Sequence, residues 1–408
     1  MIKSDYLDIT KLTANKEILR LFDVVAKHGG VLRFVGGAVR DALMKVKSYD
    51  LNLATDLSPE ELVEICEEED YDVVRLGIKQ KSIGVVINKE IVEISSLYKY
   101  VTDKNGSLQV EYTDNWEEDA SRRDLTINAV YTDEKGNVFD YYNGIDDLEK
   151  GIVRFIGSAN QKIKEDPLRI LRYFRFYSMY GKGEPNRKAI DACVENCELL
   201  KKLPMEKIRE ELLKIIKTHR ASDVYKLMQD NDVLSYIMPK ADYIDDLKFF
   251  NVIAQGQKID NEEIIKLFIL YRPDELLAEN LASRLKLNKA QKKLLLALGK
   301  RKVSFEELQI EANYQKFVYL YGVDFCKGWL LVYCAEKRKF LDNLWDLYNK
   351  FAIVSRPVFP IEGKDIINFG IADNRRIGSY IKEIEKRWID SNFALTKNQL
   401  LDQFDEII

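Results

Sequence analysis

A change of pattern near residue 157 constrains the fold more than any other feature of the sequence. Before it, strand and helix patterns alternate, and two stretches read as β-hairpins, one turning at Asn88-Lys89 and the other near Gly136. Beyond it the strand patterns stop, and amphipathic helical patterns such as that of 166–181 continue almost to the end. The sequence therefore predicts an α+β fold, in which a head with a mixed or antiparallel sheet precedes an all-helical remainder.

Length and composition exclude several classes of protein. At 408 residues the chain is too long for one compact core, so we expect several domains. No apolar run approaches the roughly 18 to 20 residues that cross a bilayer. The first residues lack the charged-then-apolar layout of a signal peptide. These features predict a cytoplasmic protein with no membrane partner.

Cysteine and histidine usage argues against a zinc site or a histidine-based catalytic triad. The only histidines are His28 and His219. Cys193 and Cys197 are four residues apart, a helical spacing, and no second pair of cysteines or histidines completes a zinc set. The sequence therefore predicts reduced, partly buried thiols at the five cysteines. They are Cys66, Cys193, Cys197, Cys326 and Cys334.

Charge is nearly balanced over the chain but not locally. The formal net charge of −4 argues against a protein that coats nucleic acid without specificity. Residues 162–188 nevertheless contain eight basic and three acidic residues, a local excess of five positive charges. We expect a basic surface there.

A glycine pair, Gly36-Gly37, ends the predicted strand "VLRFVG" and opens a helix. Without side chains, backbone N–H groups approach phosphate oxygens closely, and the start of a helix favours anions. Arg40, one turn into the helix, can pair with phosphate through two hydrogen bonds. Taken alone, the pair favours the simpler interpretation, a tight strand-to-helix turn with Arg40 as a surface charge.

Asp50 and Asn52 lie on the next predicted strand, where residues two apart point the same way. Two oxygen ligands on one strand face form half of a site for two Mg²⁺ ions, the arrangement used for in-line nucleotidyl transfer. A third carboxylate should come from a neighbouring strand, and Glu93 is the best candidate. The alternative for Glu93 is a solvent-facing charge on an edge strand.

Two later segments add arginines beside aspartates. Arg122 and Arg123, next to Asp124, suit recognition of ribose and triphosphate. Further on, one aspartate and three arginines are spaced by three, which predicts a gradually turning row on one helix side. These four are Asp166, Arg169, Arg172 and Arg175. An aspartate and an arginine together offer acceptors and donors for a base edge, although a charged, solvated helix face explains the row more simply.

Together these segments resemble the class II tRNA nucleotidyltransferases, or CCA-adding enzymes, and their relatives the bacterial poly(A) polymerases. Both belong to the DNA polymerase beta-like nucleotidyltransferase superfamily. The matching pieces occur in family order from residue 32 to about 216, and a late block at 359–401 looks like the tail of bacterial members. The pieces are "GGAVRD" with "YDLNLAT", "RRDLTINA", "DYYNGIDDL", "EDPLRILR" and "KIREELLKII".

The resemblance implies a domain plan and residue roles. The plan is a nucleotidyltransferase head at 1–156, a helical neck at 157–225, a helical body at 226–355 and a helical tail at 356–408. Gly36, Gly37, Arg40 and Arg123 would contact the incoming CTP or ATP, and Asp50 with Asn52 would hold magnesium. Asp166 and Arg169 would template C and A, with Arg172 and Arg175 supporting nucleotide and phosphates. The helical body and tail would hold the acceptor arm of tRNA, whose 3′ end is the expected partner.

The resemblance implies magnesium-dependent addition of CCA to tRNA 3′ ends, but the head departs from the family pattern in three places. The second metal aspartate is Asn52; "IKQKSIG" (78–84) replaces a His-Gly-Thr-like turn; and Tyr98 replaces an arginine of the flexible loop. An engineered change would explain Asn52 alone, whereas natural divergence would explain all three. The alternatives are partial addition of CC or A, poly(A) synthesis, and an RNA-binding relative that adds no nucleotides.

Overall fold

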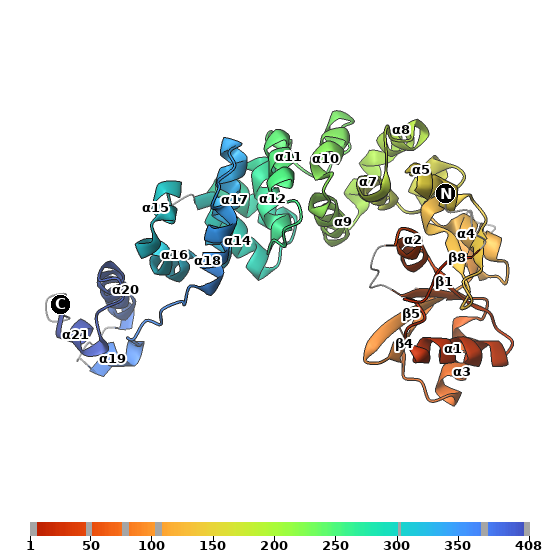
Figure 1. Ribbon diagram of the computed structural model, residues 1–408, viewed down its shortest axis with the longest axis horizontal. Coiled ribbons are helices and arrows are strands. Elements are labelled where there is room, and N and C mark those ends of the chain that lie inside the picture. The colour runs from red at the N-terminus through yellow and green to blue at the C-terminus, as the bar shows by residue number, and fades with distance from the viewer. Residues whose placement is uncertain are drawn as a thin grey trace. The chain divides into compact units, whose positions relative to one another are not determined.

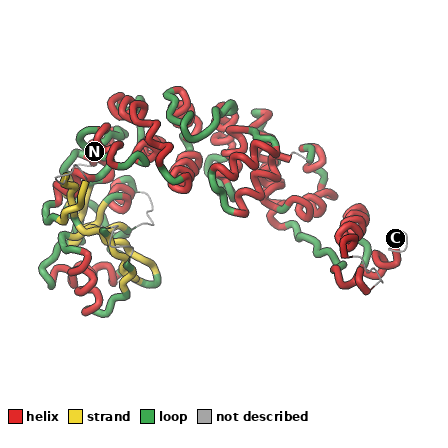
Figure 2. The backbone as a smooth tube through the Cα atoms, turned by 180° about the vertical axis from the view of Figure 1, so that it is seen from behind, coloured by secondary structure: helices red, strands yellow, loops and turns green. Residues whose placement is uncertain are grey.

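Two compact units make up the chain in this computed structural model, which describes residues 6–45, 51–75, 81–102, 108–300, 303–368 and 374–403. The first unit comprises 1–220 with 226–239, and the second comprises 221–225 with 240–408. All described strands lie in the first unit, while the second is built from helices and loops (Figure 2). The predicted α+β head with an all-helical remainder is confirmed.

A seven-stranded mixed sheet forms the centre of the first unit, in the order β3-β4-β5-β2-β1-β8-β9. Only the pair β2 and β5 is parallel, and the other neighbours are antiparallel. The strands are β1 (Leu32–Val35), β2 (Asn52–Thr55), β3 (Val73–Val74), β4 (Ser82–Ile87), β5 (Glu90–Ser96), β8 (Val130–Thr132) and β9 (Val138–Asp140). A separate two-stranded sheet contains β6 (Tyr98–Thr102) and β7 (Leu108–Tyr112).

Both predicted hairpins are confirmed. The β4–β5 turn is Asn88-Lys89, and both residues have positive φ angles of 52° and 68°, as a tight two-residue hairpin turn requires. The β8–β9 turn contains Gly136 at a φ of 90°. A Cβ atom at Gly136 would lie 2.4 Å from the carbonyl oxygen of Leu7, so both the angle and the space demand glycine.

Alternating residues of β1 connect the two faces of the sheet to different helices. Phe34 packs against Phe22 of α1, with ring centroids 5.0 Å apart. Val35 belongs to a buried cluster on the other face with Trp116 and Tyr131. Helices α1 and α3 lie next to each other beside the sheet, and α2 packs against β1 and β8 (Figure 1). The face with α2 is the one that carries the candidate site.

The helices of the first unit begin at polar capping residues in several cases. Ser58 and Glu61 form a capping box at the start of α3, and Asn115 accepts backbone hydrogen bonds at the start of α4. The helices are α1 (Lys16–Lys27), α2 (Gly37–Leu43), α3 (Pro59–Glu68), α4 (Trp116–Arg122), α5 (Gly144–Lys150), α6 (Ala159–Glu165), α7 (Arg169–Tyr180), α8 (Arg187–Asn196) and α9 (Met205–Lys217), and α10 (Ala221–Asp230) is divided between the units.

Aromatic and aliphatic packing dominates the second unit. Near its end, Ile384, Trp388 and Leu400 form a buried cluster against which Tyr319 of α16 packs. The helices are α11 (Ile244–Ile253), α12 (Glu262–Tyr271), α13 (Glu275–Arg284), α14 (Lys289–Lys300), α15 (Phe305–Gln309), α16 (Tyr314–Tyr321), α17 (Val323–Lys337), α18 (Leu344–Ile353), α19 (Gly363–Asn368), α20 (Asn374–Asp390) and α21 (Lys397–Asp402).

Among the described residues, no single helix has the length and apolar composition of a membrane span. The pair at 311–321 and 323–337 meets that test only when its two parts, bent by 116° at their junction, are taken together.

Candidate nucleotide-binding site

A cleft of about 710 Å³ in the first unit brings together residues that lie up to 145 positions apart in the sequence, from Val35 to Tyr180. Its walls are the end of β1, the start of α2, the sheet strands β2, β4 and β5, the segment after α4, and helix α7. Of the residues predicted from the sequence, it is lined by Gly36, Gly37, Arg40, Asn52, Glu93, Arg123, Asp166, Arg169, Arg172 and Arg175. Asp50, the predicted first metal ligand, lies outside the described residues.

The turn from β1 into α2 forms one wall of the cleft. Gly36, at a φ of 67°, precedes the helix that begins at Gly37. Arg40 is 7% exposed, and its Nη1 donates to the side-chain oxygen of Asn128 over 2.7 Å while Nη2 pairs with Asp41 at 2.9 Å. Its guanidinium also lies over the ring of Tyr180, 4.6 Å from the centroid. Arg40 is thus a fixed cation in the cleft wall rather than a surface charge.

Asn52 and Glu93 lie side by side on the parallel strands β2 and β5, as paired residues of the register. Strand β5 lies between β4 and β2, so Glu93 is not on an edge strand. Its side chain is exposed to the cleft, where Oε1 accepts a hydrogen bond of 2.7 Å from the Ser82 hydroxyl. The structure therefore places an amide oxygen and a carboxylate next to each other, and these are ligands that magnesium prefers.

Arg122 is the last residue of α4, Arg123 follows it, and both line the cleft. Both pair with the buried carboxylate of Asp119, and Arg123 Nε also donates to the Tyr131 hydroxyl over 3.0 Å. The guanidinium of Arg122 lies 3.5 Å from the ring centroid of Tyr98. Tyr98 was expected in a loop, and that expectation is wrong: Tyr98 starts strand β6, which pairs with β7. Its alternation with Tyr100 suits a strand.

The row predicted on one helix side is also partly wrong, because Asp166 does not lie on that helix. Asp166 has an extended backbone, with φ −149° and ψ 101°, and α7 begins at Arg169. The cause is Pro167, since a residue before proline is disfavoured in the helical conformation. One carboxylate oxygen of Asp166 accepts from the Leu168 N–H at 3.0 Å. Asp166 and Arg169 still line the same cleft.

Arg169 is held in one orientation by three acceptors. Its Nη1 donates to the Glu165 carboxylate over 2.7 Å and to the Lys162 carbonyl over 3.0 Å. Its Nη2 donates to the Arg122 carbonyl over 2.9 Å. Only 11% of the Arg169 side chain is exposed. Among the contacts that the described residues make, Nε–H and one Nη2–H of Arg169 remain as donors for a ligand.

Two further arginines of α7 pair with buried carboxylates. Arg172 Nε donates to Asp124 over 2.7 Å, and Arg175 forms an ion pair with Glu211, with 2.9 Å between nitrogen and oxygen. Burial alone would raise the pKa of Asp124, but Arg172 and a hydrogen bond from Asn128 outweigh it and hold the pKa well below its usual value. Asp124 raises the pKa of Arg172 in turn. The ion pair is therefore stable near neutral pH.

Sequence reasoning missed the partners that orient these arginines. Asp41, Asp119 and Asn128 were not among the predicted site residues, yet each accepts a hydrogen bond or ion pair from an arginine of the cleft. Two of them stand inside motifs that were recognised, Asp41 in "GGAVRD" and Asn128 in "RRDLTINA". Asp119 stands just before the second motif, and its spacing of three and four residues from Arg122 and Arg123 is the signal that could have found it.

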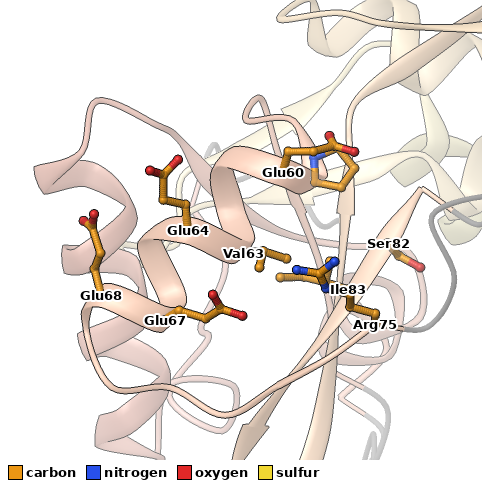
Figure 3. A pocket seen from close by; sticks show the side chains of 9 residues that line it. Glu60, Val63, Glu64, Glu67, Glu68, Arg75, Ser82 and Ile83 are labelled. Atoms are coloured by element: carbon orange, nitrogen blue, oxygen red, sulfur yellow. The ribbon is translucent and has the colours of Figure 1, made fainter.

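A second cavity, of about 510 Å³, lies beside helix α3 and shares Ser82 with the cleft. Four exposed glutamates on successive turns of α3 line it, with Arg75 and Ile83 opposite (Figure 3). The glutamates are Glu60, Glu64, Glu67 and Glu68. A triphosphate would be repelled there, so the arginine-lined cleft is the better nucleotide site.

Comparisons with known proteins agree with the motifs. The Poly A polymerase head domain family matches residues 32–154, and the family described as the probable RNA and SrmB-binding site of polymerase A matches 186–244. The mitochondrial CCA tRNA nucleotidyltransferase 1 of Homo sapiens is 31% identical over 389 residues, covering 93% of this chain and 88% of that protein. The CCA-adding enzyme of Ligilactobacillus salivarius is 26% identical over 399 residues, covering 96% of each.

Solved structures show the same fold. The crystal structure of the Bacillus stearothermophilus CCA-adding enzyme in complex with CTP has a TM-score of 0.77, at 21% identity, covering 96% of this chain and 97% of that one. The Thermotoga maritima CCA-adding enzyme complexed with tRNA-CCA has a TM-score of 0.60, at 20% identity, covering 99% of each. The resemblance predicted from the ordered motifs is confirmed. This chain belongs to the CCA tRNA nucleotidyltransferase family and carries the nucleotidyltransferase head of that family.

Proposed function

We propose that this chain adds C, C and A to the 3′ end of tRNA, using CTP and ATP. The terminal ribose hydroxyl attacks the α-phosphorus of the bound nucleotide, a new P–O bond forms with loss of the hydroxyl proton, and the bond to pyrophosphate breaks. The observation that carries the proposal is a cleft in which fixed arginines, the Asp166 and Arg169 pair and the Asn52–Glu93 wall lie together. Family membership supports the tRNA as acceptor.

The triphosphate and ribose would bind between the α2 wall and the segment after α4. Gly36 and Gly37 allow close approach of backbone N–H groups, while Arg40 and Arg123 supply fixed positive charge. Arg172 and Arg175 would support the nucleotide from α7. Each of these arginines already pairs with a carboxylate, so little side-chain freedom is lost when a nucleotide binds.

Base selection would depend on Asp166 and Arg169. The carboxylate oxygen of Asp166 that does not accept from Leu168 would accept from the exocyclic amine that C and A share. The remaining donors of Arg169 would face the ring nitrogen that accepts in both bases. Uracil and guanine present a carbonyl oxygen where the amine should be, so the carboxylate would reject them. The protein would thereby act as the template.

Magnesium fits the oxygen donors of Asn52 and Glu93 at the strand pair. The family resemblance adds Asp50, outside the described residues, as a further residue that would hold it. When bound, the ion stabilises negative charge on the transferring phosphoryl group and on the leaving group. Asn52 supplies an oxygen but no charge, so this site would hold a divalent ion less tightly than one with two aspartates. The Ser82 hydroxyl orients Glu93 toward the cleft.

The remaining assignments follow the family plan. We place the head at 1–156, the neck at 157–225, the body at 226–355 and the tail at 356–408, with the helical parts holding the acceptor arm of tRNA. Contact with phosphates would make binding strongly dependent on salt. We place the protein in the cytoplasm, as its sequence predicts.

An incorporation assay tests the proposal. The full chain is incubated with tRNA lacking its CCA end, magnesium, and labelled CTP or ATP, alone and together, and the product length is read at single-nucleotide resolution. We expect two C residues with CTP alone and one further A when ATP is added. Addition of C only or A only would indicate a partial enzyme, and long runs of A would indicate poly(A) synthesis.

The asparagine at position 52, where the family has an aspartate, favours one alternative that is not an enzyme: an RNA-binding protein that adds no nucleotides. That alternative predicts tRNA binding by filter retention without incorporation of either label. If both the natural chain and an Asn52→Asp variant bind tRNA but incorporate nothing, the proposed activity is wrong.

A further inference from the structure

Two arginines of the cleft, Arg122 and Arg123, both donate to one carboxylate. That carboxylate belongs to none of the family motifs quoted above. This carboxylate is Asp119, on α4, and its side chain is fully buried. Oδ1 accepts from Arg122 Nε over 2.7 Å, and Oδ2 accepts from Arg123 Nη2 over 2.9 Å. The Tyr131 hydroxyl donates to Oδ2 over 2.7 Å. One carboxylate thus fixes two neighbouring arginines at once.

The surroundings of Asp119 make its position rigid. Trp116 and Ala120, on either side of it in α4, belong to the buried cluster that also contains Tyr131. The rings of Trp116 and Tyr131 meet edge to face, with centroids 5.4 Å apart. Asn115 caps the helix by accepting from two backbone N–H groups. Because both the helix and the tyrosine are packed, the carboxylate cannot follow its arginines if they move.

Asp119 stays charged in this buried position. Burial alone would raise its pKa, but the attraction of Arg123 and Arg122, with the hydrogen bond from Tyr131, lowers the pKa below the usual value of an aspartate. Burial alone would lower the pKa of Arg123, but Tyr131 and Asp119 outweigh it and raise the pKa. A buried charge whose partners were removed would be costly, so the arrangement holds together as a unit.

The anchor leaves part of each arginine free to bind. Arg122 and Arg123 are 14% and 16% exposed, and both line the cleft. In each arginine, the Asp119 carboxylate accepts from Nε–H and from one Nη2–H. Among the contacts that the described residues make, none uses the N–H groups on Nη1, so these remain for another acceptor. Arg122 is further held by the ring of Tyr98 beneath it. The Nη1 N–H groups of both arginines therefore point in fixed directions.

We propose that Asp119 is the positioning residue that orients Arg122 and Arg123 toward the triphosphate and ribose of the incoming nucleotide. This inference rests on the proposed function, because it takes the cleft to be the nucleotide site. Asp119 itself touches no substrate and acts only through the two arginines.

Asp147 provides a matched control in the same unit. It is a buried carboxylate that accepts from one arginine, Arg154, and from one hydroxyl, that of Thr126, each over 2.6 Å. Arg154 does not line the cleft but a different cavity. Asp147→Asn and Asp119→Asn therefore both remove a buried charge that holds an arginine, and only the second disturbs the cleft.

The experiment compares the two variants of the full chain by thermal melting, by calorimetric titration with CTP and with ATP, and by steady-state kinetics. We expect Asp119→Asn to raise the KM and the Kd for both nucleotides by roughly tenfold to a hundredfold, with the KM for tRNA unchanged within about twofold. Asp147→Asn should lower the melting temperature comparably and leave nucleotide KM within about twofold. Equal nucleotide effects in the two variants would show that Asp119 only stabilises the fold and would overturn the proposal.

A double-mutant cycle tests whether Asp119 acts through its arginines. Arg123→Lys should cost less in the Asp119→Asn background than in the natural chain, because the anchor is already lost. Full additivity would contradict the proposal. The titrations also distinguish failure of this inference from failure of the proposed function. If the natural chain binds nucleotides without incorporating them, the proposed activity is wrong, but the role of Asp119 can still be tested by comparing the nucleotide Kd of the variants. A natural chain that binds neither nucleotide overturns both.

Discussion

The cleft and the acidic cavity beside α3 lie in the same unit and share Ser82, yet their charged side chains are organised in opposite ways. Each arginine of the cleft pairs with a carboxylate, and four of those carboxylates are at most 10% exposed. They are Asp119, Asp124, Glu165 and Glu211. The glutamates of the acidic cavity are exposed, and they belong to the outer face of a helix.

The difference concerns orientation more than charge. A charge on a solvent-facing helix costs little and can adopt many rotamers, so it provides a field but no direction. An arginine locked by a buried carboxylate has few rotamers left and presents its remaining N–H groups along fixed lines. Recognition of a triphosphate or a base edge needs such directions. The comparison can be tested by variants that change charge or orientation on each side.

The largest effect should come from restoring charge at the metal-binding wall. Asn52→Asp places a second full negative charge beside the predicted metal site, and we expect kcat for CTP addition to rise roughly a hundredfold or more, because each 1.36 kcal/mol of transition-state stabilisation is tenfold in rate. Single-turnover incorporation measures it. Asn15→Asp is the control, since it adds the same charge to the head but only exchanges one helix cap for another. An unchanged rate would mean that the cleft is adapted to the amide.

Breaking an orienting pair should reduce stability in a pH-dependent manner. Asp124→Asn keeps the shape of the side chain but removes the charge that holds Arg172, and we expect a loss of about 2 kcal/mol in the free energy of unfolding at pH 7. The folded pKa of Asp124 is lowered, so its contribution is complete above the pKa of the unfolded chain, near 3.8, and is lost as pH falls below it. Urea denaturation of both proteins at several pH values measures it. The difference between the two proteins should shrink in acid, and a constant difference from pH 7 to 3 would contradict the ion-pair account.

Changing orientation while keeping charge should have a smaller but selective effect. Arg169→Lys retains the positive charge beside Asp166 but loses the planar guanidinium that Glu165 holds. We expect kcat/KM for CTP and ATP to fall about tenfold, with a smaller fall for UTP and GTP, because one directed hydrogen bond to the base is lost. Competition assays with all four nucleotides measure it. Arg154→Lys, outside the cleft, should change none of these values. Equal losses for all four nucleotides would assign Arg169 to phosphate binding and remove its templating role.

Much of the cleft could be predicted because its residues stand in local motifs whose backbone follows from the sequence. The glycine pair must end a strand, and a two-residue turn at Asn88-Lys89 fixes which residues of β4 and β5 face each other. Placing Glu93 beside Asn52 required only that β5 pair with β2. Local rules therefore predicted the turns and the register of the hairpin, whereas the pairing of β5 with β2 joins Asn52 and Glu93 across 41 positions and is not local.

Some partners of the arginines are local: Asp41, Asp119 and Glu165 lie within four residues of the arginines that they hold, so their spacing could have pointed to them. The sequence could not identify the other partners, because those are long-range contacts. Arg172 and Asp124 are 48 positions apart, and Arg40 and Asn128 are 88 apart. Charge patterning offers many acidic residues for each arginine and no way to choose among them. The error at Asp166 was different: Pro167 was visible in the sequence, and the spacing of three was given more weight than the constraint that proline places on the residue before it.

The smallest effect should come from the acidic cavity, and it is the direct control for the comparison. Glu64→Gln combined with Glu67→Gln removes two exposed charges from α3 without changing its packing. Exposed substitutions of this kind change stability by about 0.5 kcal/mol or less. Salt near 0.15 M screens exposed charges beyond about 8 Å, so we expect kcat/KM for CTP within about twofold of the natural chain. If the double variant instead improved nucleotide binding severalfold at that salt concentration, and the gain shrank when the salt was raised further, unoriented charge on α3 would be acting on the cleft and the distinction drawn between the two cavities would fail.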